Sequence, residues 1–109
     1  MHLSDVDPAL KAERLYQARA AYLSGDYAGA LEKALQSNHE GWHVAGAAAC
    51  ALQDTEWVMR AAANLSLPER NWLQAICRRR GVAVLYLDSD RPRAFRIDLK
   101  PAGHVDEDE

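Results

Sequence analysis

The chain has 109 residues, of which 49% are hydrophobic, and its formal net charge is −3. A chain of this length fits one domain that buries a modest core without help from a metal. The acidic balance excludes a whole-protein attraction to nucleic acid or acidic membranes, and no apolar run is long enough to span a bilayer. The first residues also lack the basic and apolar regions of a secretory signal, so we expect a cytoplasmic protein without membrane contact.

The spacing of apolar residues and of capping residues predicts five helices in succession. Asp7-Pro8 opens the first helix, Gly25 ends it, and Asp26 caps the second. The third helix consists almost entirely of small residues, which is typical of a helix covered on several sides. A capping box at 66–69 opens the fifth helix, and Gly81 stops it. The predicted helices span residues 8–24, 27–36, 39–52, 56–65 and 67–80.

The composition changes after Gly81, where strand-forming residues become frequent. Val82 to Leu87 reads as a strand, Asp88 to Arg93 as a turn, and Ala94 to Leu99 alternates with period two. The sequence therefore predicts a helical domain over 1–81, a β-hairpin extension over 82–100, and a disordered acidic tail over 101–109.

Two segments of the helical part resemble a tetratricopeptide repeat. Residues 25–31 read Gly-Asp-Tyr-Ala-Gly-Ala-Leu, similar to the Gly-Asp-Tyr-x-x-Ala-Leu turn inside that repeat. Trp42 and Gly46 stand as in its Trp-x-x-Leu-Gly opening, although Ala49 replaces the large aromatic that follows. The resemblance covers about residues 11–66 and implies antiparallel helical hairpins with a concave binding face. The closing Pro of the repeat is missing and the spacing is shorter than the usual 34 residues or so, which favours a compact bundle over a superhelix.

A second resemblance runs through two longer segments, Trp42 to Asp54 and Leu65 to Gly81. Their pattern is similar to helical-repeat segments attached to bacterial eukaryote-type Ser/Thr kinases. It implies a bacterial signalling context without kinase activity, because the chain lacks the Gly-rich loop and the His-Arg-Asp catalytic loop.

One short string could carry chemistry. His39-Glu40-Gly41-Trp42-His43 has the form HExxH, in which two His one helical turn apart bind Zn²⁺ and the Glu serves as a base. Glu56 or Glu69 could complete the metal site. Against this, only helices precede the string, where a zinc protease has a substrate-binding strand, and the string begins its helix. We expect no metal and no cofactor, and keep a small zinc hydrolase using His39 and His43 as an alternative.

The two cysteines, Cys50 and Cys77, form no CxxC motif, and both fall on apolar helix positions. This pattern favours two buried thiols in a reducing compartment over a disulfide.

The leading interpretation is a non-enzymatic protein–protein interaction module, an adaptor or regulatory subunit. It binds a partner segment on a repeat-like groove, or pairs through the strand from Ala94 to Leu99 with a partner or with a second copy as a homodimer. Nucleic-acid or phosphate binding through the three successive arginines is an alternative that the acidic net charge disfavours. The predicted partner-binding residues are Tyr16, Arg19, His43, Arg78, Arg79 and Arg80.

Overall fold

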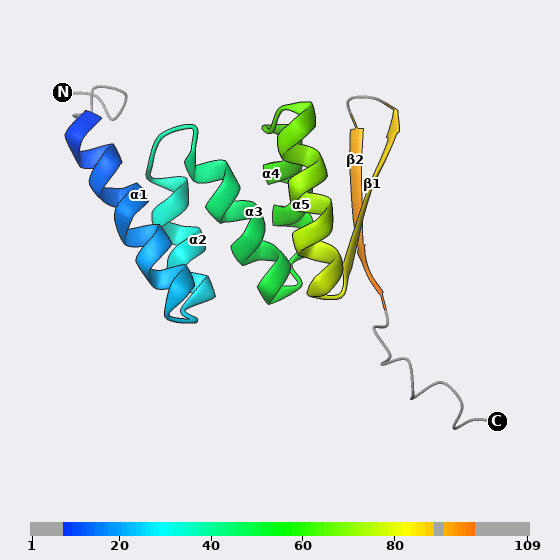
Figure 1. The fold of residues 1–109 in the computed structure, drawn as a ribbon, viewed down its shortest axis with the longest axis horizontal. Helices are drawn as coiled ribbons and strands as arrows, with labels where there is room; N and C mark the ends of the chain where they lie inside the picture. The colour runs from blue at the N-terminus through cyan, green and yellow to red at the C-terminus, as the bar shows by residue number, and fades with distance from the viewer. Residues whose placement is uncertain (1–7, 89–90, 98–109) are drawn as a thin grey trace.

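In the computed structural model, which describes residues 8–88 and 91–97, five helices precede one antiparallel pair of strands (Figure 1). This confirms the predicted fold, mainly helical with a hairpin after the helices. The acidic tail predicted over 101–109 lies outside the described residues. The elements are α1 (Pro8–Leu23), α2 (Tyr27–Leu35), α3 (Gly41–Leu52), α4 (Thr55–Ala63), α5 (Leu67–Arg79), β1 (Val82–Asp88) and β2 (Arg91–Arg96).

The helices form two layers. Figure 1 shows α1, α3 and α5 side by side in front, with α2 and α4 behind them. Each helix of the front layer packs against the next, α1 on α3 and α3 on α5, and the rear helices join them into hairpins. The β-hairpin closes the stack, since β1 packs on α5 and β2 packs on α4. The hairpin thus covers the end of the bundle formed by α4 and α5.

The core consists of two adjoining clusters, and Trp42 packs against both. Alanine fills most of the first cluster, between α1, α2 and α3, because the short side chain lets these helices approach closely. The second cluster joins α3, α4 and α5 to β1. Its largest fully buried side chains are Leu73, Val58, Val82, Cys50 and Cys77.

Local signals account for the helix ends. Gly25 and Gly81 adopt positive φ angles of 89° and 85°, where a side chain would be strained. The Asp26 carboxylate accepts the Gly29 N–H at 2.9 Å, as an N-cap does. The predicted capping box is present: the Glu69 carboxylate accepts the Ser66 N–H at 2.7 Å.

Gly46 lets α3 approach α5 and α4 closely. A Cβ atom at this position would lie 2.9 Å from Cδ1 of Leu73 and 3.3 Å from Cβ of Ala61. Leu73 is completely buried at this contact. Because Gly46 of α3 has no side chain, the large Leu73 side chain of α5 fills the space beside it.

The prediction of two free thiols is wrong. Cys50 of α3 and Cys77 of α5 form a disulfide, with their Cα atoms 5.0 Å apart. The prediction of burial is right, since both residues are fully covered. The bond ties together the two front helices that also meet at Gly46. The cysteines therefore give no support to a reducing compartment.

The hairpin differs from its predicted form in the second strand. β2 begins at Arg91, three residues before the predicted start, and pairs with β1 in the register Leu85↔Arg93 and Tyr86↔Pro92. The sequence did not indicate this pairing, because Pro92 lies inside the expected turn and a proline is unusual within a strand. Ile97 donates its N–H to the Gly81 carbonyl at 2.8 Å, and antiparallel alternation from there turns the nitrogen of Pro92 away from β1. Its missing N–H therefore costs no hydrogen bond.

Candidate groove on the front helical layer

Among the described residues, side chains from α1, α3 and α5 line an open groove of about 330 Å³. Its lining is mostly apolar, with one arginine and one histidine, which is typical of a recognition surface. The lining residues are Arg19, Tyr22 and Leu23 of α1, His43, Val44 and Ala47 of α3, and Trp72 of α5. Of the predicted partner-binding residues, Arg19 and His43 meet here.

Leu23 and Trp72 were missed in the sequence. Leu23 is 84% exposed, although it is fully apolar, and Trp72 is 41% exposed. For Leu23 a signal exists, because it follows Arg19 by four residues and so shares a helix face with it. For Trp72 no such signal exists, because the sequence does not show that its neighbour Leu73, and not Trp72 itself, is the buried residue.

His43 is held from two sides. Its Nε2 lies 2.8 Å from Oε2 of Glu69, and its Nδ1 lies 3.1 Å from the carbonyl oxygen of Glu40. Its ring meets the Trp72 ring edge-on, with the centroids 5.6 Å apart. Glu69 therefore has two structural roles. It completes the capping box of α5, and it orients His43 in the groove.

The Glu69 contacts predict a loss of stability in acid. Hydrogen bonds from the Ser66 backbone and hydroxyl, and then the nearby His43, lower the pKa of Glu69 below its usual 4.5. The ionised carboxylate thus stabilises the fold above the unfolded-state pKa, and this contribution disappears as the pH falls through the lowered folded-state pKa. We expect the melting temperature of Glu69→Gln to fall less than that of the wild type when the pH is lowered from about 5 to about 3. Equal losses in the two proteins would contradict this role.

The Arg19 guanidinium lies 3.7 Å from the Glu40 carboxylate, across the gap between α1 and the start of α3. Both side chains are more than half exposed, so this pair contributes little to stability. Arg19 is therefore free to exchange Glu40 for a carboxylate of a ligand at small cost.

Arg80 stands at the end of α5, where it braces the groove rather than lining it. Its guanidinium lies over the Tyr27 ring, 5.1 Å from the centroid, and donates to the Tyr27 hydroxyl at 3.2 Å. Contacts with the hydroxyls of Tyr22 and Tyr27 raise the pKa of Arg80 above its ordinary value. The two tyrosine rings also meet edge-on, with centroids 5.3 Å apart. Arg80 thereby fixes Tyr22, which lines the groove.

The other predicted partner-binding residues are dispersed. Tyr16 is 73% exposed on α1 and does not line the groove. Arg78 lines a separate hollow between α5 and β1, and Arg79 is exposed. The three successive arginines thus lie in three environments and do not form one patch.

The HExxH string does not form one site in the structure. α3 begins at Gly41, so His39 and Glu40 lie in the turn before it, where the Asn38 side chain accepts the Glu40 N–H at 3.0 Å. His39 lines a hollow beside α2 with Trp42, whereas His43 lines the groove. Within residues 8–88 and 91–97, no group of three His, Cys, Asp or Glu residues is placed to hold a metal ion.

No helix in the described part of the chain is long and apolar enough to cross a membrane. The tetratricopeptide resemblance rests on residues 25–31 and 42–49 alone. Comparisons of the chain with protein-family models, with curated proteins and with solved structures found no match.

Proposed function

We propose that this chain is a non-enzymatic protein–protein interaction module that binds a segment of a partner protein in the groove of α1, α3 and α5. The observation that carries the proposal is an open apolar groove whose rim displays Leu23, 84% exposed, beside Trp72. A leucine in this position gains about 1.5–3 kcal/mol when a partner covers it, and nothing in the described fold covers it.

The polar groups around the groove suit recognition better than catalysis. His43 is bound to Glu69 and Arg19 is paired with Glu40, so each basic group already has an acidic partner within the fold. No Ser, Cys or Asp side chain is among the described residues that line the groove, so this part of the chain supplies no nucleophile of those kinds there. The arrangement supports binding through an apolar anchor, with Arg19 selecting carboxylates at the rim.

An adaptor or regulatory subunit is the role that we propose for such a surface, and the resemblance in the sequence implies a bacterial signalling context. A homodimer through the edge of β2 stays an alternative mode of association. The cytoplasmic location remains a prediction of the sequence, which the cysteines no longer support.

The test uses the chain as bait in a lysate, beside two variants that each replace one exposed leucine by aspartate. Leu23→Asp places a charge in the groove, and Leu67→Asp places one on another leucine, 69% exposed at the start of α5 and outside the groove. We expect at least one protein to be enriched by the wild type and by Leu67→Asp, and to be lost with Leu23→Asp. Melting curves check that all three proteins fold.

A protein retained equally by all three baits would contradict binding in this groove. So would a protein lost with both variants, because the loss would then reflect surface charge rather than the groove.

A further inference from the structure

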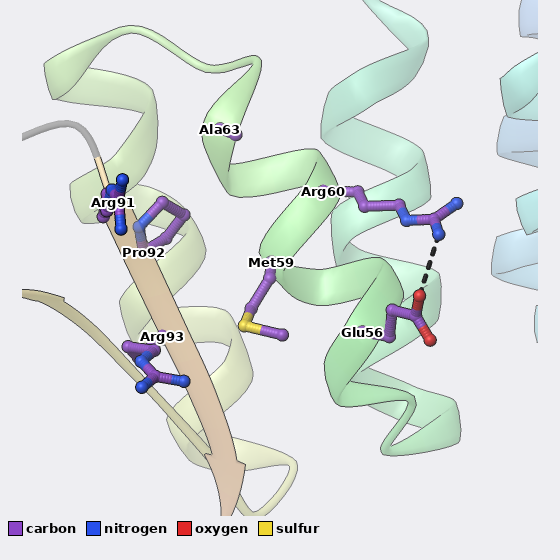
Figure 2. A pocket seen from close by; sticks show the side chains of 7 residues that line it. All are labelled: Glu56, Met59, Arg60, Ala63, Arg91, Pro92 and Arg93. Carbon is purple, nitrogen blue, oxygen red and sulfur yellow. Dashed lines mark hydrogen bonds and ion pairs between the residues drawn. The ribbon is translucent and has the colours of Figure 1, made fainter.

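A second groove, of about 610 Å³, lies on the rear of the molecule between α4 and β2. Figure 2 shows Met59 of α4 between the strand and the Glu56–Arg60 ion pair. That pair is closed at 2.8 Å, and the Arg60 guanidinium also lies over the Trp57 ring at 4.7 Å. Arg60 is thus already engaged on the far side of the groove.

The opposite wall of the groove is formed by β2, whose backbone has an edge without a strand partner among the described residues. In the part of the chain that the structure describes, the sheet has two strands, so β2 has a strand neighbour on one side only. The bond between Ile97 and Gly81 fixes the alternation of the ladder, and this places the N–H and C=O groups of Ala94 and Arg96 on the free edge. A strand that arrives along this edge can pair with them.

Positive charge is carried by β2 itself. The strand holds three arginines, at positions 91, 93 and 96, in a chain of net charge −3. Arg91 and Arg93 are both exposed on β2, and no carboxylate among the described side chains lies within ion-pair distance of either. They occupy alternate positions, so they lie on the same face of the strand.

We propose that the groove between α4 and β2 binds an extended acidic segment of a partner protein, which pairs with β2 as a third strand. Acidic side chains at alternate positions of the segment lie beside Arg91 and Arg93, as neighbours on adjacent strands do. The intervening side chains lie beside Pro92, toward Met59 and Ala63, where small apolar residues fit. The segment therefore alternates acidic and apolar residues. The inference rests on the proposed function, because it names a second partner-binding mode of the same module.

A protein segment fits this groove better than a nucleic acid does. The described residues that line the groove include no aromatic side chain on which bases could stack, and the Glu56 carboxylate repels phosphates. Free backbone donors and acceptors on a strand edge match another strand rather than a sugar–phosphate chain. The chain's own acidic residues 106–109 follow Pro101 and Gly103, and both of these residue types are poor strand formers, which favours a segment from another protein.

The probe is a short fluorescein-labelled peptide in which Glu and Val alternate, titrated with the full chain and followed by anisotropy. We expect Arg91→Gln with Arg93→Gln to weaken binding about tenfold or more. The control, Arg14→Gln with Lys33→Gln, removes equal charge from α1 and α2 and is expected to change the affinity less than about threefold. The same peptide with alternate N-methylated amides is expected not to bind, since it cannot pair as a strand.

Each of the following results would overturn the inference. The probe does not bind at about millimolar protein, or it binds the Arg91 and Arg93 variant with equal affinity. The N-methylated peptide binds with equal affinity, or an oligonucleotide binds as tightly as the probe and is lost with the same variant. Tighter binding after residues 106–109 are changed to their amides would assign the groove to the chain itself, and would likewise overturn it. Leu23→Asp is expected to leave the probe affinity unchanged, so failure here is distinct from failure of the front groove.

Discussion

Leu73→Ala is expected to lower the free energy of unfolding by about 3–4 kcal/mol, as measured by urea denaturation. Leu73 is the largest fully buried side chain in the protein's described part, and it joins α5 to α3, α4 and β1 in one cluster. Its truncation removes contacts on every side, and the disulfide next to it hinders the collapse of α5 onto the cavity. The cost therefore exceeds the transfer free energy of the lost carbons.

Gly46→Ala supplies the matched control for this prediction. On its own it should destabilise the fold, because the new methyl group overlaps the methyl groups of Leu73. In the Leu73→Ala background the same substitution should cost clearly less, since the overlapping atoms are gone. A loss below about 1 kcal/mol for Leu73→Ala, or additive costs in the double variant, would contradict the packing of α3 on α5.

Replacing both Cys50 and Cys77 by Ala is expected to lower the free energy of unfolding by about 3–4 kcal/mol. The disulfide closes a loop over the end of α3, all of α4 and most of α5, with a sequence separation of 27, and so restricts the unfolded chain. Both residues are fully buried, so their removal also loosens the core between these helices. Urea denaturation without reductant measures the difference from the wild type.

Thiol counting provides the independent control for the disulfide. In denaturant without reductant, the wild type is expected to take up no alkylating reagent, and after reduction it should take up two equivalents, one for each cysteine. Alkylation of two thiols before reduction would show that the bond is absent. Replacing Cys50 and Cys77 by Ala would then destabilise the fold only by the smaller cost of truncating two small core side chains.

The parts of the fold that were predictable are those encoded over a few residues. Gly25, Gly81, Asp26 and the Ser66 capping box act within one helical turn, so the sequence predicts where the helices begin and end. The start of α3 was placed too early because the Asn38 side chain takes the Glu40 N–H and keeps that segment in a turn.

The remaining features depend on contacts between distant segments. The register of β2 is set by its pairing with β1 and its packing on α4, neither of which the turn-rich composition around Pro92 reveals. The disulfide depends on how α3 and α5 are brought together, and two cysteines without a motif do not indicate it. The groove was half predicted: helix spacing indicated Arg19 and His43, whereas the exposure of Trp72 depends on which side of α5 faces α3.

The most direct test of the central claim is site-specific photo-crosslinking in the source cells. A benzophenone amino acid replaces Leu23 in the front groove, and in a matched strain it replaces Leu67, which is exposed outside the groove. A crosslinked adduct that forms from position 23 with a distinct partner, and not from position 67, is the predicted result. Adducts of the same kind from both positions, or none from position 23 while the protein remains folded, would contradict the groove as a partner-binding site.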